Sequence, residues 1–114
     1  SLRSAFLHLF QIDCILGENI DRNYDLVINT TSSQLSNVLP SINSIAVKGA
    51  DSYDVNYSWQ QTLFQGWSDD NGSNTALQGW GMLVEQAAES FSIWRGIRPE
   101  TFDVVDRLQA EVEN

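Results

Sequence analysis

Residues 79–88 combine backbone freedom with a polar side chain at helical spacing. They read Gly-Trp-Gly-Met-Leu-Val-Glu-Gln-Ala-Ala, so two glycines open an amphipathic helix. Glycine lets another molecule approach the backbone, and the unpaired N–H groups of a helix N-terminus favour phosphate or carbonyl oxygens. Gln86 follows Met82 by one turn on the same helix face, and its amide both donates and accepts hydrogen bonds. The segment predicts either a ligand-binding helix start or a glycine-rich turn into an ordinary core helix.

Hydroxyl side chains follow the segment that most strongly predicts a strand. Within residues 24–29, Leu26, Val27 and Ile28 form a continuous apolar run that is typical of a buried parallel strand. Residues 30–33 read Thr-Thr-Ser-Ser, and ligands of doubly wound sheets bind in the crevice beyond the carboxyl ends of the strands. These hydroxyls are therefore placed to contact a ligand. The alternative is a turn in which they satisfy their own backbone.

A tyrosine stands near the end of the next predicted strand, residues 52–57. Its phenol can donate a hydrogen bond to a carboxylate or hydroxyl of a ring substrate, and Tyr57 is the candidate. Tyrosine is also common at half-buried positions, so an amphipathic residue at the rim of the fold is the alternative.

The remaining pattern supplies the elements that position these residues. Apolar residues at helical spacing predict a helix over residues 2–10, and residues 12–16 are predicted to form a short strand. Further along, the sequence predicts an extended segment at residues 44–47, one to two helical turns at 59–67, a polar loop at 68–74 and a strand at 75–78. A helix is predicted over residues 82–95, ending at Gly96. A terminal helix is predicted after Pro99, with one apolar face formed by Phe102, Val105, Leu108 and Val112. Alternating strands and helices predict the α/β class.

Composition limits the partners. With 114 residues the chain has room for one domain, and its longest apolar runs are far shorter than a membrane span. A net charge of -9 opposes nonspecific binding to nucleic acid or anionic membranes. The single cysteine, Cys14, excludes an internal disulfide and fits a reducing compartment. The sequence shows no export signal, so we expect a cytoplasmic protein.

No metal site is predicted. His8, Asp13 and Cys14 match no common zinc spacing, and His8 fits a helix surface. Residues 69–74 superficially suggest a calcium loop. Counted from Asp69, however, the twelfth position is Trp80 rather than glutamate, so this segment is predicted to be a turn.

Three motifs, in order and approximate spacing, resemble the C-terminal end of shikimate dehydrogenases, which reduce 3-dehydroshikimate with NADPH. They are the strand and hydroxyl loop of residues 24–33, the Tyr-Asp-Val-Asn-Tyr of residues 53–57, and the helix start at residue 79 continued through residues 89–96. The resemblance covers residues 2–113. It implies a partial Rossmann-like, doubly wound sheet, truncated and followed by C-terminal helices. Residues 1–114 would then form the C-terminal part of a dinucleotide-binding domain.

The same resemblance implies a site. Tyr57 and Gln86 match residues that bind the shikimate ring. NADP would be bound by Asn29, Thr31, Ser32, Ser33, Val55, Gly79, Met82 and Leu83. Asn29 matches the asparagine that holds the hydroxyl loop, and the last three close over the nicotinamide. The sequence departs from the family pattern at Gln34 (often glycine), Val55 (often methionine), Gln78 (usually Asp) and Trp80 (usually Leu).

Several family parts are missing. The sequence has no G-x-G-x-x-G turn and no Asn-Arg-Thr segment for the adenosine phosphate. The family's N-terminal substrate domain, with its Ser-x-Ser pair and its proton-handling Lys and Asp, is also absent. The resemblance therefore predicts a fragment without catalytic residues, inactive alone, whose partners are shikimate or 3-dehydroshikimate and the missing substrate domain.

Other assignments remain open. Strand 12–16 would lack its native neighbours, so an edge-paired homo-oligomer is a further expectation. A noncatalytic binding or assembly module of the same fold is one alternative function. A quinate/shikimate dehydrogenase that uses NAD is another.

Overall fold

The centre of the molecule is a small parallel sheet. The computed structural model describes residues 13–113. Three strands, β1 (Leu26–Asn29), β2 (Asp51–Asp54) and β3 (Thr75–Gln78), lie in the order β1-β2-β3, and both pairs are parallel. This arrangement confirms the predicted α/β class and the partial Rossmann-like sheet.

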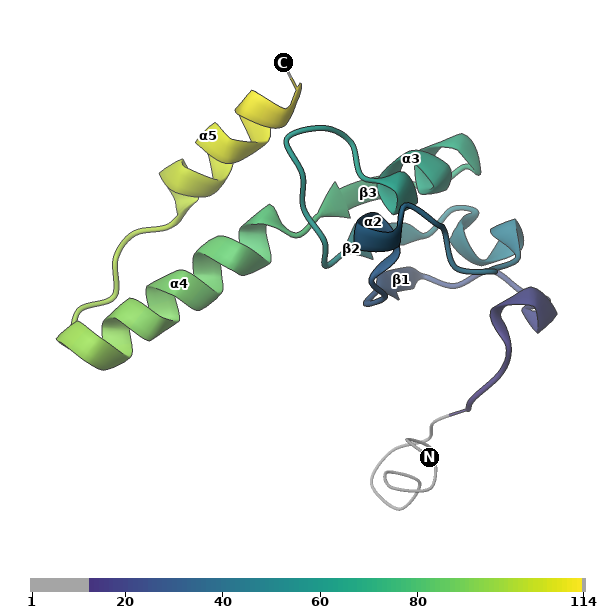
Figure 1. Ribbon diagram of the computed structural model, residues 1–114, viewed down its shortest axis with the longest axis horizontal. Coiled ribbons are helices and arrows are strands. Elements are labelled where there is room, and N and C mark those ends of the chain that lie inside the picture. Colours follow the sequence, from purple (N-terminus) through teal and green to yellow (C-terminus); the bar gives the residue numbers. More distant parts are fainter. Residues whose placement is uncertain (1–12, 114) are drawn as a thin grey trace.

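Helices follow each strand (Figure 1). A single turn, α2 (Ser33–Ser36), comes directly after β1, and α3 (Leu63–Asp70) connects β2 to β3. Two short 3-10 helices, η1 (Gly17–Asn19) and η2 (Ser44–Val47), lie in the connections. The last two helices, α4 (Trp80–Arg95) and α5 (Phe102–Glu113), form a hairpin that extends away from the sheet.

The two faces of the sheet differ. Successive residues of a strand point to opposite faces. Ser52 and Asp54 of β2 are buried on the face where α3 contacts the sheet, together with Phe64 of α3. On the other face, Leu26, Ile28 and Leu77 are 57%, 52% and 49% exposed. Within the described residues β1 has one neighbour, β2, so its outer edge is open and pairing with another copy stays a prediction.

The strongest periodic segments fold as predicted. β1 occupies most of residues 24–29, and β3 coincides with residues 75–78. Helix α4 begins at Trp80, two residues before the predicted start, and ends where predicted because Gly96 adopts a left-handed φ of 72°. The terminal helix is also present. It begins at Phe102, and Pro99 lies before it rather than in its first turn.

Two predicted extended segments are wrong. Residues 44–47 form η2, because the Asn43 side chain accepts a hydrogen bond from the Ile45 N–H at 3.2 Å and caps a helical turn. Residues 13–16 form no strand, and Ile12 lies outside the described residues, as does the predicted helix 2–10. An isolated strand without a partner has no ladder hydrogen bonds to hold it.

The boundaries of the segment between β2 and β3 also shift. The strand predicted over residues 52–57 ends at Asp54, where its side chain turns the backbone. The helix predicted over residues 59–67 begins only at Leu63, because the Thr62 hydroxyl caps the N–H of Gln65. It continues to Asp70, into the segment predicted to be a loop.

Within residues 13–113, no helix has both the length and the apolar character that crossing a membrane requires. The same residues contain no cluster of three or more His, Cys, Asp or Glu side chains arranged to hold a metal ion. Cys14 is exposed, and His8 lies outside the described residues.

Candidate functional site

A row of buried polar side chains crosses the carboxyl end of the sheet. The strand register aligns Asn29 with Asp54 and Asp54 with Gln78. These side chains are 3%, 0% and 7% exposed. Buried polar groups need hydrogen-bond partners, so they organise the loops beyond this edge.

Asp54 is the centre of this row. Its Oδ1 accepts hydrogen bonds from the Asn29 Nδ2 at 3.1 Å, from the Asn56 N–H at 3.1 Å and from the Asn56 Nδ2 at 2.8 Å. Its Oδ2 is buried without a hydrogen-bond partner in the described part of the chain. The carboxylate therefore ties β1 to β2 and bends the chain after β2.

Asn29 holds the hydroxyl loop, as the resemblance implies. Its Oδ1 accepts from the Thr31 N–H at 3.1 Å and from the Thr31 hydroxyl at 2.7 Å. Its Nδ2 also donates to the Ser33 hydroxyl at 3.0 Å, and Ser33 is buried. The Thr31 and Ser32 side chains are exposed and available to a ligand. Binding of a cofactor by this loop stays a prediction.

Asn56 joins the hydroxyl loop to the start of α4. Its Nδ2 donates to the Thr31 carbonyl at 2.9 Å, and its own carbonyl accepts the Gly79 N–H at 2.8 Å. A Cβ at Gly79 would lie 2.3 Å from the Val55 carbonyl oxygen, so only glycine fits there. Residues after all three strands are thus brought into direct contact.

The first turn of α4 is open on one side. A Cβ added to Gly81 meets nothing within 4 Å, whereas the Met82 N–H donates to the Tyr53 hydroxyl at 3.3 Å. The Met82 side chain is 43% exposed. A glycine with free space above it, exposed hydroxyls nearby and an exposed thioether fit one end of a dinucleotide cofactor.

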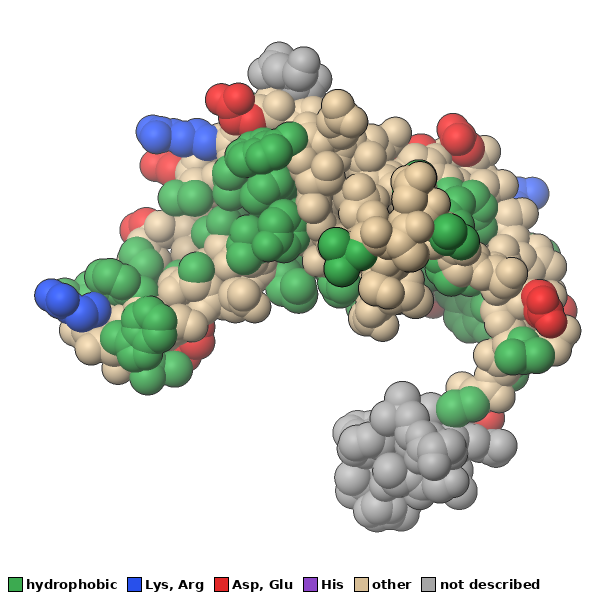
Figure 2. All heavy atoms as spheres, in the orientation of Figure 1, with side chains coloured by type: hydrophobic (Ala, Val, Ile, Leu, Met, Phe, Trp, Pro, Cys, Tyr) green, Lys and Arg blue, Asp and Glu red, His purple; other side chains and the backbone are tan. Residues whose placement is uncertain are grey.

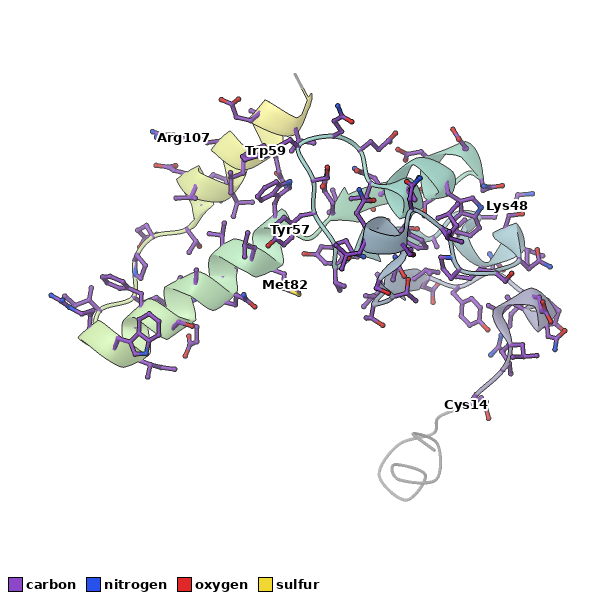
Figure 3. All side chains as sticks on the ribbon, in the orientation of Figure 1. Cys14, Lys48, Tyr57, Trp59, Met82 and Arg107 are labelled. Carbon is purple, nitrogen blue, oxygen red and sulfur yellow. The ribbon has the colours of Figure 1, made fainter. Side chains whose placement is uncertain are left out.

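No hydrogen bond or ring contact within residues 13–113 joins the two predicted substrate residues, Tyr57 and Gln86. Tyr57 is 44% exposed, and its ring packs on Trp80. Figure 3 shows Tyr57 on the side of α4 that faces α5 and Met82 on the opposite side. Gln86 is exposed one turn beyond Met82, and no hydrogen bond within residues 13–113 connects it to the hydroxyl loop. Its role in substrate binding stays a prediction.

Leu83 lies on the side of α4 that faces α5. It lines a groove of about 370 Å³ between α4 and α5, together with Val84, Ala87, Phe91, Pro99 and Val104. Arg98 closes the far end of this hairpin through ion pairs with Glu85 and Glu89. A hydrogen bond from the Thr101 hydroxyl, followed by the charge of Arg98, lowers the pKa of Glu85 below its ordinary value.

The hairpin exposes many apolar side chains. Figure 2 shows them gathered over α4 and α5. The most exposed are Ile93 at 74%, Trp94 at 79%, Ile97 at 68% and Phe102 at 73%. Exposed apolar patches of this kind occur on surfaces that bind another protein, a membrane or a ligand.

Sequence reasoning missed Asp54, Asn56 and Gln78 as organising residues. Asp54 and Asn56 have the spacing of an Asx turn, in which an aspartate side chain accepts the N–H two residues later, so that signal was available. Contacts across strands, such as that of Asp54 with Asn29, depend on the register of the sheet.

Three comparisons bear on this site. Residues 79–107 match the family model "Shikimate 5'-dehydrogenase C-terminal domain". The chain is 46% identical over 96 residues to a shikimate dehydrogenase (NADP(+)) from Marinobacter nauticus, covering 82% of this chain and 34% of the relative. It is 47% identical over 112 residues to the enzyme of that name from Alkalilimnicola ehrlichii, covering 94% of this chain and 42% of the relative.

A solved structure is similar as well. The crystal structure of an Ael1 enzyme from Pseudomonas putida aligns with a TM-score of 0.69 at 38% sequence identity, covering 75% of this chain and 32% of that chain. The chain spans 34% and 42% of the length of the two curated relatives quoted above.

Proposed function

Because the chain is a homologue of NADP-linked shikimate dehydrogenases over their C-terminal part, we propose that it forms one wall of the site in which such an enzyme reduces 3-dehydroshikimate to shikimate. The observation that carries the proposal is the convergence of three segments at the carboxyl edge of the sheet. Asn29, Asp54 and Asn56 connect the hydroxyl loop to the start of α4. Ligands of doubly wound sheets bind at this edge.

The cofactor is proposed to lie against the first turn of α4. Bound NADPH supplies a hydride, and the chain contributes orientation and exclusion of water. Met82 and Val55 offer apolar contacts, and Gly81, which has open space where a Cβ would stand, allows close approach to the backbone. The exposed Ser32 hydroxyl is proposed to contact polar parts of the cofactor, next to Thr31, whose hydroxyl donates to the Asn29 Oδ1.

The substrate is proposed to contact Tyr57 and Gln86. A phenol donates to a carboxylate or hydroxyl, and an amide donates to one ring hydroxyl while accepting from another. Both side chains are exposed, which a ligand contact requires. We assign these two groups to binding and orientation of the substrate, and the proton that accompanies hydride transfer to other residues.

The proton-handling lysine and aspartate are proposed to come from another domain. The exposed apolar face of α4 and α5, with Trp94 and Phe102, supports this proposal because it offers a surface for such a domain to cover. We accordingly expect the 114-residue chain alone to lack dehydrogenase activity.

Titration of the chain with NADPH and with shikimate, followed by NMR, tests this proposal. Supporting shifts would be confined to residues 31–33, Tyr57 and residues 79–86. No response to either compound at millimolar concentration would contradict it and favour a noncatalytic module. A parallel titration with NADH and quinate separates the NAD-dependent alternative from the proposed one.

In a full-length enzyme of the proposed kind, Gln86→Ala is expected to raise KM for shikimate about two- to tenfold, because a lost hydrogen bond to a ligand is worth about 0.5–1.5 kcal/mol. Gln109→Ala is the control, since Gln109 is an exposed amide on α5. Unchanged kinetics in the Gln86 variant would remove this residue from the site.

A further inference from the structure

Residues 58–60, which follow Tyr57, are bound by two side chains from the junction of β3 and α4. These are Gln78, the last residue of β3, and Trp80, the first residue of α4. Both are buried, at 7% and 6% exposure. The segment between β2 and α3 has no regular structure at these residues, so its conformation depends on such contacts.

Gln78 binds the backbone of this segment at two points. Its Oε1 accepts the Ser58 N–H at 2.7 Å, and its Nε2 donates to the Gln60 carbonyl at 3.3 Å. The same Nε2 lies 3.3 Å from the Gln65 Oε1 on α3. A buried amide with both ends bound is held in one orientation, so it fixes the backbone that it contacts.

Trp80 binds the same segment through its ring. Its Nε1 donates to the Ser58 carbonyl at 3.3 Å. The Tyr57 ring lies 4.8 Å from the Trp80 ring, centroid to centroid, and the Trp59 ring lies 4.7 Å from it. The planes are tilted by 46° and 39°. The indole of Trp80 therefore contacts the rings on both sides of Ser58.

Tyr57 depends on these contacts for its orientation. Its ring is 44% exposed, and no residue among 13–113 makes a hydrogen bond to its hydroxyl. An exposed side chain without a polar contact at its tip samples several rotamers unless its ring or its backbone is held. Here Trp80 holds the ring, and Gln78 with Trp80 holds the next residue of the backbone.

We propose that Gln78 and Trp80 are positioning residues that hold the Tyr57 phenol in its substrate-binding orientation. This inference rests on the proposed contact between Tyr57 and the ring substrate. Fixing one side chain in advance removes an ordering cost from binding, which corresponds to about a two- to tenfold change in affinity. The effect falls on substrate binding and not on the chemical step.

The kinetic test compares Trp80→Leu with Trp80→Phe in a full-length enzyme of the kind that the proposed function implies. Trp80→Leu is expected to raise KM for shikimate about three- to tenfold and to leave kcat within about twofold. Trp80→Phe retains an aromatic ring and is expected to stay near the wild-type KM. Gln78→Met, which removes both hydrogen bonds to residues 58–60, is expected to raise KM in the same direction and serves if Trp80→Leu does not fold.

Trp67→Leu is the matched control. Trp67 also packs on another aromatic ring, that of Phe64 at 5.6 Å, but it lies on α3, and within residues 13–113 no hydrogen bond or ring contact joins it to residues 58–60. Its loss is expected to lower stability without raising KM. If Trp80→Leu and Trp67→Leu change KM equally, Trp80 has only a structural role and the inference is wrong.

A second measurement needs no ligand. The Tyr57 ring resonances, assigned with Tyr57→Phe, are expected to carry a ring-current shift from Trp80, to move in Trp80→Leu and to be largely retained in Trp80→Phe. Unchanged resonances in Trp80→Leu would overturn the inference. A wild-type enzyme that binds no shikimate would instead overturn the proposed function, so the two failures are distinguishable.

Discussion

The carboxyl edge of the sheet and the α4–α5 hairpin are stabilised in different ways. At the sheet edge, Asn29, Asp54 and Gln78 are buried and hydrogen-bonded to the loops that follow the strands. In the hairpin, the polar contacts of Arg98 are exposed, and Trp94 and Phe102 are more than two-thirds exposed. Surface ion pairs contribute little to stability.

The geometry of the sheet edge is determined by this chain alone, whereas the packing of the hairpin depends on a further surface. The sheet edge satisfies most of its own polar groups within the described residues, so its geometry follows from this chain. The hairpin has an open groove between α4 and α5 and leaves most of its apolar residues uncovered. We therefore expect changes at the sheet edge to alter stability strongly, and changes on the hairpin surface to alter it weakly.

A pair of phenylalanine truncations gives the largest expected contrast. Phe64 is 1% exposed under the sheet, whereas Phe102 is 73% exposed on α5. Phe64→Ala is expected to lower the free energy of unfolding by about 3–5 kcal/mol, and Phe102→Ala by less than about 0.5 kcal/mol. Urea unfolding measures both. Equal losses would mean that the hairpin contributes to the core as much as the sheet does.

The polar network gives the next largest effect. Asp54→Ala removes the acceptor of three hydrogen bonds, from the Asn29 Nδ2, the Asn56 Nδ2 and the Asn56 N–H, and an unsatisfied buried donor costs about 1–3 kcal/mol. We expect a loss of about 3–4 kcal/mol in the free energy of unfolding. Asp54→Asn retains the Oδ1 acceptor and is expected to cost about 1 kcal/mol. Similar losses in the two variants would show that the charge of Asp54, not its acceptor, stabilises the edge.

The contrast between local and long-range contacts also explains which elements could be predicted from the sequence. The apolar run of Leu26, Val27 and Ile28 and the spacing in α4 predict elements correctly, because local periodicity decides them. Residues 44–47 were predicted to be extended, yet a capping bond from Asn43 makes them helical. Such a cap competes with propensity over only a few residues, where periodicity carries little information.

The candidate site shows the same limit. Asn29 was identified from the motif that it belongs to; it accepts two hydrogen bonds from Thr31 of the loop, and its part in cofactor binding stays a prediction. Gln78 and Trp80 were noticed only as departures from a family pattern. Their common contact with Ser58 depends on how β3 and the chain after β2 lie together, and that is a property of the folded sheet.

A pair of glycine substitutions distinguishes close approach from open space at the start of α4. Gly79→Ala brings a Cβ to 2.3 Å from the Val55 carbonyl oxygen and is expected to cost about 2 kcal/mol. Gly81→Ala meets nothing within 4 Å and is expected to stabilise α4 by about 0.5–1 kcal/mol. Thermal unfolding gives the sign of each effect. A stabilising Gly79→Ala would show that β2 and α4 are packed less closely than the structure has them.

Lowering the pH is expected to have the smallest effect on stability, and the effect of Glu85 is confined mainly to the contacts between α4 and α5. The Thr101 hydroxyl and Arg98 lower the pKa of Glu85, so the charged form of Glu85 is favoured in the folded hairpin. A group with a depressed pKa stabilises the fold above its ordinary pKa, about 4.3 for glutamate, and this contribution is lost as the pH falls through the lower, folded value. Attachment of α5 to α4 should therefore weaken as the pH falls below that ordinary value.

Hydrogen exchange of the α5 amides, measured across this pH range and corrected for intrinsic rates, reports the attachment directly. Glu85→Gln is expected to remove the pH dependence of α5 protection and to leave protection in β2 unchanged. Asp51 also has a lowered pKa, through hydrogen bonds from Asn74 and Thr75, so acid weakens the sheet independently and Asp51→Asn separates that part. Protection of α5 that does not change with pH in the wild-type chain would mean that apolar contacts in the groove, and not the Glu85 contacts, hold the hairpin together.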